Sequence, residues 1–320
     1  MDIDLSEQQL LLRDALQRLT VSVDRPQWAD LCESIGLGAL TLPEALGGFG
    51  GGVADIALTM AELGPALAGA DWLSHAVACL VAGDALPDAE DFASGTRRAA
   101  LICTANAVNL PQVIAQRRIE GTATLVSGAA GAHLFVLVIE GQRYIVRADD
   151  AGLMCTTIAM HDGTQTATVD FQGVSAAAIG PGDTDADALM QLGRCAEAVG
   201  LMHRMLVDTA DYLAQRHQFG APIASFQALR HRLADMHLAL AQAEALTEAA
   251  VIAPQDATAV ASACYGVRDA ARIVGEGAVQ LHGAMGLTEE LTLGARFKRL
   301  LTIAAGLGSE AALVGILRAA

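Results

Sequence analysis

The sequence predicts an α+β protein in which helices come first, a small block of strands follows, and helices return to the end of the chain. Apolar residues repeat with helical spacing over residues 1 to about 98, alternate with a period of two over about 99–178, and resume helical spacing from about 184. We therefore expect an N-terminal helical domain, a small central antiparallel β domain and a C-terminal helical bundle. The expected boundaries are 1–98, 99–180 and 181–320.

The composition predicts a folded chain that binds neither nucleic acid nor a membrane. Of the 320 residues, 53% are hydrophobic and 18% charged, enough for one large domain or for two or three small ones that share cores. The net charge is −16 without a visible basic stripe, which disfavours nucleic acid. No apolar run approaches the roughly 20 residues of a membrane span, and the acidic N-terminus is unlike a signal peptide.

The cysteines and histidines predict a cytoplasmic protein without a metal site. All six cysteines stand singly, with no CxxC pair, so we interpret them as free thiols in a reducing compartment. The eight histidines show no metal-ligand spacing. The general motifs HExxH, GxSxG and GxxxxGK[ST] are absent, so periodicity alone names no activity.

The first helix is marked at its start. Ser6 and Gln9 stand three residues apart, as a capping box requires, and apolar residues then follow with helical spacing up to Leu19. Further helices are expected over about 27–36, 53–68 and 71–83.

The central stretch is rich in Val, Ile, Thr and aromatic residues, which favour strands. Glu140, Gly141 and Gln142 form the expected hairpin turn between two of the runs. The expected strands cover 99–103, 134–139, 144–146 and 166–171.

The C-terminal stretch predicts several helices with recognisable ends. A first helix is expected over about 186–213, and a second that Ser225 caps and Pro254 ends. A third is expected from about 256 to 282, with Gly283 as its stop. The caps of the two last expected helices are Thr288 and Ser309.

One corner between these helices could bind an anion. Arg216 ends the long first helix, and its planar guanidinium can give two parallel charge-assisted bonds to a diphosphate. Gly220 lets backbone amides approach, and the helix that begins near Ser225 adds a favourable dipole. On these residues alone, an ordinary interhelical corner held by an arginine salt bridge is the simpler interpretation.

The sequence of this corner, RHQFGAPIASFQ followed by HRLADM, resembles the signature of the acyl-CoA dehydrogenases. These flavoenzymes introduce a double bond next to a CoA thioester. The segments DLSEQQLLLRD, LTLPEALGGFG with MAELG, and QLHGAMGLT are similar to other parts of the same family, in the same order. The resemblance covers nearly the whole chain and implies an acyl-CoA dehydrogenase-like fold that ends in a four-helix bundle.

In that family, the arginine corner of one subunit grips the pyrophosphate and adenine half of an FAD held mainly by a neighbouring subunit, and the C-terminal glycine turn completes the clamp. The resemblance therefore implies FAD at a subunit interface. Its implied contacts are Arg216, Gln218, Phe219, Gln280 and Gly283. Ala284 replaces the family's second glycine, and its methyl group would crowd the cofactor.

The residues that the family uses for catalysis are missing. Its base is a glutamate just before a glycine, and Ala305, at the equivalent position, has no proton-accepting group. Some members carry the base on the long helix, where Met190 stands here. The family's TEP and GSD elements, which hold the flavin ring and the thioester, are also absent after the first expected strand. We therefore assign no catalytic residue.

Two carboxylates are weak candidates for a relocated base, Glu197 and Glu290. A structural role is the simpler interpretation of each. Glu197 can pair with Arg194, three residues earlier on the same helix. Glu290, like Glu289 before it, suits the start of a helix because its charge complements the helix dipole.

This selective loss resembles the small non-catalytic subunit of bacterial heterotetrameric acyl-CoA dehydrogenases. The resemblance implies a catalytic acyl-CoA dehydrogenase paralogue as partner, a bulky, steroid-like acyl-CoA as substrate, and an electron-transfer flavoprotein as acceptor. Two alternatives stay open. One is a complete homo-oligomeric enzyme with a relocated base, and the other is a flavin-free scaffold of the same fold.

Overall fold

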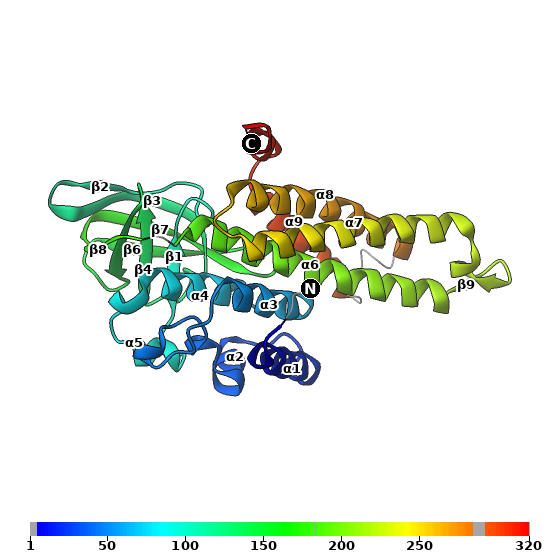
Figure 1. Cartoon of the computed structure of the whole chain (residues 1–320), viewed down its shortest axis with the longest axis horizontal. Coiled ribbons are helices and arrows are strands. Elements are labelled where there is room, and N and C mark those ends of the chain that lie inside the picture. Colours follow the sequence, from blue (N-terminus) through cyan, green and yellow to red (C-terminus); the bar gives the residue numbers. More distant parts are fainter. Residues whose placement is uncertain (1–4, 183, 284–291, 320) are drawn as a thin grey trace.

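The computed structural model describes residues 5–182, 184–283 and 292–319. Figure 1 shows the N-terminal helices along one side of a bundle of long helices, with two β-sheets at one end of that bundle. The bundle is formed by α6 (Ala186–Gln215), α7 (Gln227–Ile252), α8 (Ala257–His282) and α9 (Thr292–Gly306).

The N-terminal helices follow the predicted order. They are α1 (Glu7–Ser22), α2 (Trp28–Ile35), α3 (Val53–Leu63), α4 (Ala70–Ala82) and α5 (Ala89–Ala93). The predicted capping box is confirmed, because Ser6 Oγ accepts from Gln9 N at 3.2 Å and Gln9 Oε1 accepts from Ser6 N at 3.1 Å. The helix expected over 53–68 ends at Leu63, before a short 3₁₀ turn that contains Pro65. The five-residue α5 was not predicted, since it is too short to show a period.

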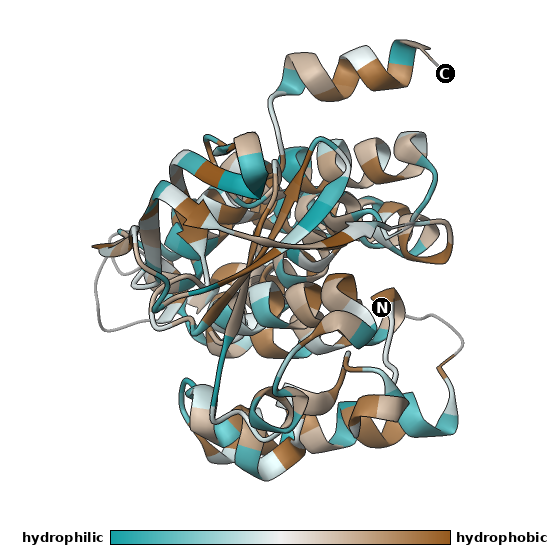
Figure 2. Ribbon diagram, turned by 90° about the vertical axis from the view of Figure 1, so that its left-hand side faces the viewer, coloured by the Kyte–Doolittle hydropathy of each residue, from teal (hydrophilic) through white to brown (hydrophobic). Residues whose placement is uncertain are grey.

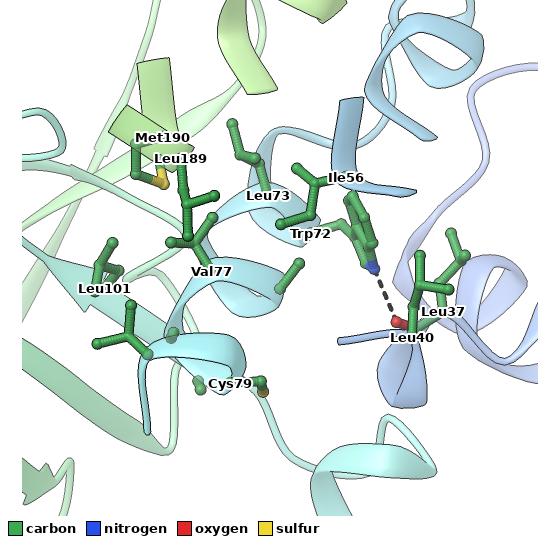
Figure 3. Packing of buried hydrophobic residues seen from close by; sticks show 14 of the residues in the cluster. Leu37, Leu40, Ile56, Trp72, Leu73, Val77, Cys79, Leu101, Leu189 and Met190 are labelled. Carbon is green, nitrogen blue, oxygen red and sulfur yellow. Dashed lines mark hydrogen bonds between the residues drawn. The ribbon is translucent and has the colours of Figure 1, made fainter. Parts of the chain in front are cut away.

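The N-terminal helices and α6 share one apolar core. Figure 3 shows Trp72 of α4 within it, where the indole N–H donates to the carbonyl oxygen of Leu37 at 2.9 Å. Met190 of α6 is fully buried in the same cluster. α3 and α6 approach closely, since a Cβ on Gly200 would lie only 2.0 Å from the carbonyl oxygen of Ala61.

The strands form two four-stranded sheets. The first has the order β1 (Ala99–Ile102), β4 (Leu134–Ile139), β5 (Gln142–Arg147), β8 (Ala177–Pro181). The second has the order β2 (Gln112–Ile114), β3 (Arg118–Ser127), β7 (Gln165–Ser175), β6 (Leu153–Ala159). Each of the four predicted runs forms a strand, although β1 ends at Ile102, one residue before the predicted end at Cys103. Glu140 and Gly141 form the predicted turn with φ values of 49° and 75°.

The first sheet is mixed rather than purely antiparallel, because β1 pairs with β4 in parallel. β1 is buried along its whole length, and its alternate residues face two cores. Leu101 packs with the N-terminal helices, and Ile102 packs between the two sheets. The strands β2, β3, β6 and β8 were not predicted. β6 is exposed at most positions, so it carries no alternating apolar signal.

The ends of the bundle helices test the predicted caps. Asp256 Oδ1 accepts from Thr258 N at 2.9 Å at the start of α8, and Gly283 ends that helix with φ 62°. Ser309 Oγ accepts from Ala312 N at 3.2 Å, which confirms it as the cap of α10 (Glu310–Ala319). The prediction for Ser225 is wrong, since its hydroxyl donates to the carbonyl oxygen of Pro222 and α7 begins after Phe226. Thr288 lies outside the described residues.

α10 stands apart from the other helices in Figure 2, although Leu313 is buried against the bundle core. Among the described residues, no single helix has the length and apolar content to cross a membrane. α9 and α10 reach that length only as a pair, and they are bent by 50° relative to each other.

Candidate functional site

The residues singled out in the sequence lie at opposite ends of the bundle. Ala305 is near the end of α9, beside the β-sheets, where it lines a cavity. Arg216 follows α6 at the other end, near the label β9 in Figure 1. We call residues 216–226 the corner, and the cavity that Ala305 lines the β-domain cavity.

The corner is a small hairpin on the end of α6. Two-residue strands, β9 (His217–Gln218) and β10 (Ala221–Pro222), pair around Phe219 and Gly220. Both tip residues have left-handed backbones, with φ of 54° and 81°, as the right-handed twist of a tight hairpin requires. Phe219 is 91% exposed, and its ring meets Phe226 edge-on with 6.0 Å between centroids. An exposed aromatic ring on a backbone conformation rare for this residue type is typical of a binding loop.

The corner and the first turns of α7 form a basic stretch within an acidic chain. No Asp or Glu occurs between Asp211 and Asp235, a stretch that contains three arginines and two histidines. Within the part of the chain that the structure describes, no ion pair or hydrogen bond engages the side chain of Arg216. Arg230 is the exception among the three arginines, since its Nε donates to the carbonyl oxygen of Ala224 at 2.8 Å. This basic stretch therefore offers cations to an external anion.

The last turn of α8 lies at the same end of the bundle. His282 stacks on Tyr212 of α6 with 4.4 Å between ring centroids, which fixes the two helix ends together. Gln280 is exposed and lines a groove of about 330 Å³ between α7 and α8, which Arg232 also lines. Gly283 is exposed, and a Cβ built on it would lie within 4 Å of no atom of the described residues. All five residues with implied FAD contacts thus occur at this end, and Ala284 lies outside the described residues.

This end fits the pyrophosphate and adenine half of FAD. Among the described residues, no side chain or backbone group binds the guanidinium of Arg216, and none fills the space beside Gly220 and Gly283. Phe219 presents an aromatic face. Cations bind the phosphates, open backbone permits close approach, and an aromatic ring can stack on a base.

The β-domain cavity has a volume of about 430 Å³. It lies between the loop after β1, the turn between β6 and β7, and the end of α9. Its polar and charged lining includes Thr104, Asn106, His161, Arg194 and Arg299. None of the described residues that line it is Asp or Glu, so Ala305 is not replaced there by a neighbouring carboxylate.

Arg194 of α6 bridges the two walls of this cavity. Its guanidinium donates to the carbonyl oxygen of Ala105, to Asn106 Oδ1 at 2.8 Å, and, on the α9 side, to the carbonyl oxygen of Gly306 at 3.5 Å. The backbone after β1 is also engaged internally, because Ala105 N donates to Asp187 at 2.7 Å and Val108 N donates to Thr124 O at 2.9 Å. Arg194 therefore crosses this cavity, and the amides of Ala105 and Val108 donate within the chain instead of facing the cavity as donors for a ligand.

Glu197 is buried outside the β-domain cavity and forms an ion pair. The prediction that Glu197 pairs with Arg194 is wrong. Glu197 instead binds Arg299 of α9 through both carboxylate oxygens, at 2.6 and 2.8 Å. The guanidinium of Arg194 donates instead to the carbonyl oxygen of Ala105 and to Asn106 Oδ1. Both oxygens of Glu197 already accept from a cation, which argues against Glu197 as a base.

Arg299 also binds Asp162, at 3.2 Å, in the turn between β6 and β7. Burial alone would raise the pKa of Asp162, but hydrogen bonds from Thr164 and the charge of Arg299 outweigh it and hold that pKa below its ordinary value. Burial disfavours the charge on Arg299, yet the carboxylates of Glu197 and Asp162 raise its pKa above the ordinary value. We call Arg299, Glu197 and Asp162 the ion triad.

The other residues considered in the sequence lie outside both sites or outside the described residues. Met190, the other position at which the family can carry a base, is fully buried among apolar residues. Glu289 and Glu290 lie outside the described residues. All six cysteines are free. In the described ranges, no group of three His, Cys, Asp or Glu side chains could hold a metal ion. Sequence reasoning missed Arg299, because nothing local marks a partner 102 residues away.

Comparisons with known proteins identify the family. A family model for the C-terminal domain of acyl-CoA dehydrogenases matches residues 188–320. The acyl-CoA dehydrogenase IpdE2 of Mycobacterium tuberculosis is 32% identical over 280 residues, which are 86% of this chain and 80% of that protein.

Solved structures show the same fold. The chain matches the Tcur3481–Tcur3483 steroid ACAD variant with a TM-score of 0.86 at 21% identity, covering 98% of this chain and 97% of that chain. The ChsE4–ChsE5 complex from Mycobacterium tuberculosis matches with a TM-score of 0.85 at 24% identity, covering 100% and 97%. PigA with FAD and proline matches with a TM-score of 0.84 at 18% identity, covering 100% and 98%. This protein belongs to the acyl-CoA dehydrogenase family.

Proposed function

We propose that this chain is a non-catalytic subunit of a heteromeric acyl-CoA dehydrogenase. It contributes the clamp for the pyrophosphate and adenine of FAD, and a paralogous partner subunit catalyses α,β-dehydrogenation of an acyl-CoA. One observation carries the proposal. The corner keeps an exposed Phe219 and an Arg216 whose side chain no described residue binds, whereas the β-domain cavity has Ala305 at the base position and no described carboxylate in its lining.

The roles of the corner residues follow from their chemistry. Arg216 binds the pyrophosphate through its planar guanidinium, and Gln218 adds an amide to the same anion. Phe219 covers an apolar face of the adenine, as its exposed ring allows. Gln280 reaches the cofactor from α8, and Gly283 leaves room at the backbone. When bound, the flavin of FAD supplies the hydride acceptor for the dehydrogenation.

The remaining machinery belongs to the partner. A base is needed to remove the α-proton, and neither Ala305 nor Met190 can accept one. The partner is therefore a catalytic acyl-CoA dehydrogenase paralogue with its own base and flavin-ring site. Similarity to the ChsE4–ChsE5 complex supports a heteromeric assembly, and similarity to a steroid ACAD supports a bulky, steroid-like acyl group. An electron-transfer flavoprotein is the proposed electron acceptor.

Visible absorbance tests this proposal. The chain is purified alone and also after co-expression with an acyl-CoA dehydrogenase paralogue. We expect a colourless chain and a yellow complex, and Arg216→Ala should remove most of the flavin from the complex. Arg18→Ala is the matched control, because Arg18 is an exposed arginine on α1, distant in sequence from the corner.

Two results would contradict the proposal. A lone chain that carries stoichiometric FAD and bleaches with an acyl-CoA would be a complete enzyme with a relocated base. A complex whose flavin content is unchanged by Arg216→Ala would leave this chain as a scaffold that does not bind the cofactor.

A further inference from the structure

The two parts of the proposed FAD clamp are carried by the ends of two different helices. Arg216 and the corner follow the last turn of α6, whereas Gln280 lies in the last turn of α8 and Gly283 follows it. Helix ends fray, because their last carbonyl groups have no donor within the helix. Two ends that bind one cofactor together bind it more tightly when their spacing is already fixed.

An aromatic stack connects these two helix ends. The ring of His282, in the last turn of α8, lies on the ring of Tyr212, in the last turn of α6, with 4.4 Å between the centroids and 23° between the planes. His282 is buried, and Tyr212 is half-buried and packs against the apolar core of the bundle. Aromatic pairs in such a stacked geometry stabilise each other beyond the area that they bury.

On the α6 side, the stack is linked to the corner through the backbone. The carbonyl oxygen of Tyr212 accepts from Arg216 N at 2.9 Å, and the carbonyl oxygen of Arg216 accepts from Ile223 N at 2.8 Å. Ile223 also packs against the core of the bundle. The place of the Tyr212 ring therefore affects the point at which Arg216 leaves the helix.

On the α8 side, His282 is fixed directly before the turn. Its Nδ1 lies 2.9 Å from the carbonyl oxygen of Ala278. Because a carbonyl oxygen only accepts, Nδ1 carries the proton, and this bond fixes the orientation of the ring. Gly283 follows with φ 62° and ψ −141°, a backbone conformation that residues with a side chain rarely adopt, so α8 stops there.

We propose that His282 and Tyr212 are positioning residues for the FAD clamp. Their stack sets the spacing between Gly283 and Arg216 before the cofactor binds, and neither ring needs to touch the cofactor. Without the stack, the two helix ends move independently, and binding must first bring them together. The inference rests on the proposed function, because the clamp is the site that the stack serves.

Substitutions that keep or remove a ring separate positioning from bulk. Tyr212→Leu and His282→Leu each remove one ring of the stack, whereas Tyr212→Phe keeps a stacking ring and should behave as the wild type. Tyr265→Leu is the matched control, since Tyr265 is a 39% exposed ring in the first half of α8. Urea denaturation shows that each variant is folded, and the two Leu variants at the stack are independent, so either suffices if the other does not fold.

Hydrogen exchange of the chain alone tests whether the stack holds the helix ends without a cofactor. In Tyr212→Leu and His282→Leu, the amides of Arg216, Ile223 and Gly283 should exchange roughly two- to ten-fold faster than in the wild type, Tyr212→Phe or Tyr265→Leu. Unchanged exchange at both helix ends would overturn the inference. Acceleration spread evenly over the bundle would also overturn it, because the stack would then contribute only to general stability.

Titration of FAD into the flavin-stripped complex with the partner tests the consequence for binding. Flavin fluorescence should give roughly ten-fold weaker binding for both Leu variants at the stack, no further loss when they are combined, and wild-type affinity for Tyr212→Phe. Normal affinity of both Leu variants, while Arg216→Ala loses FAD, would overturn this inference alone. Retention of FAD by Arg216→Ala would contradict the proposed function, and the inference would be wrong with it.

Discussion

The two ends of the bundle use arginine in opposite ways. Beside the β-sheets, Arg194 and Arg299 are enclosed, and protein oxygens accept from their guanidinium groups. At the corner, Arg216 is exposed, and no side-chain bond holds it within the described residues. A cation that is already paired inside the protein belongs to the fold, whereas an unpaired cation in a basic region is available to a ligand. The family signature alone does not distinguish these two uses.

The largest expected effect is on stability at the enclosed end. Arg299→Ala should lower the free energy of unfolding by about 3–5 kcal/mol, because it leaves Glu197 and Asp162 buried without a cation. Arg216→Ala should change it by less than about 0.5 kcal/mol, as for other exposed positions. Urea denaturation of both variants measures the difference. Similar losses of unfolding free energy for the two variants would contradict the difference between the two ends.

A smaller loss is expected for Arg194→Ala. The substitution leaves Asn106 Oδ1 and the carbonyl oxygens of Ala105 and Gly306 without this donor, which costs about 1–3 kcal/mol of unfolding free energy. The flavin content of a complex with the partner should not change. Loss of flavin with intact stability would instead make Arg194 a cofactor ligand.

The stability that Asp162 contributes at the enclosed end should depend on pH. The pKa of Asp162 is lower in the folded chain than the ordinary value of about 3.9, so its contribution to stability is complete above pH 4 and is lost as the pH falls through the lowered pKa. The stability gap between wild type and Asp162→Asn should therefore narrow from pH 7 toward pH 3. Urea midpoints across that range provide the measurement, and a constant gap would show that the Asp162 charge contributes nothing.

The last prediction is that restoring a carboxylate at the base position produces no activity. Ala305→Glu places a carboxylate at the family's base position, but Arg194 still crosses the cavity. We expect no acyl-CoA dehydrogenase activity in the isolated variant, measured with an artificial electron acceptor and added FAD. Turnover above the wild-type background would show that only the base was missing.

The sequence predicted most of the fold, because its signals there are local. The capping box at Ser6, the four apolar strand runs and the stop at Gly283 each depend on neighbours within a few residues. Features set by distant contacts were missed. The parallel pairing of β1 with β4 and the exposed edge strand β6 leave no period in the sequence.

In the candidate site, too, local signals were read correctly and long-range contacts were missed. A contiguous motif located Arg216, Gln218 and Phe219 on one small hairpin. Glu197 was paired with its helix neighbour Arg194, because an i−3 partner is the only one that a sequence can offer. The observed partner, Arg299, comes from another helix.

Flavin content of the partner complex tests the central comparison most directly. Arg216→Ala and Arg194→Ala are introduced separately, and bound FAD per complex is measured by visible absorbance after gel filtration. The account predicts that Arg216→Ala loses most of the FAD, as at least a ten-fold loss of affinity would produce, while Arg194→Ala retains it. Retention by Arg216→Ala together with loss by Arg194→Ala would contradict the account and assign the cofactor to the β-domain cavity.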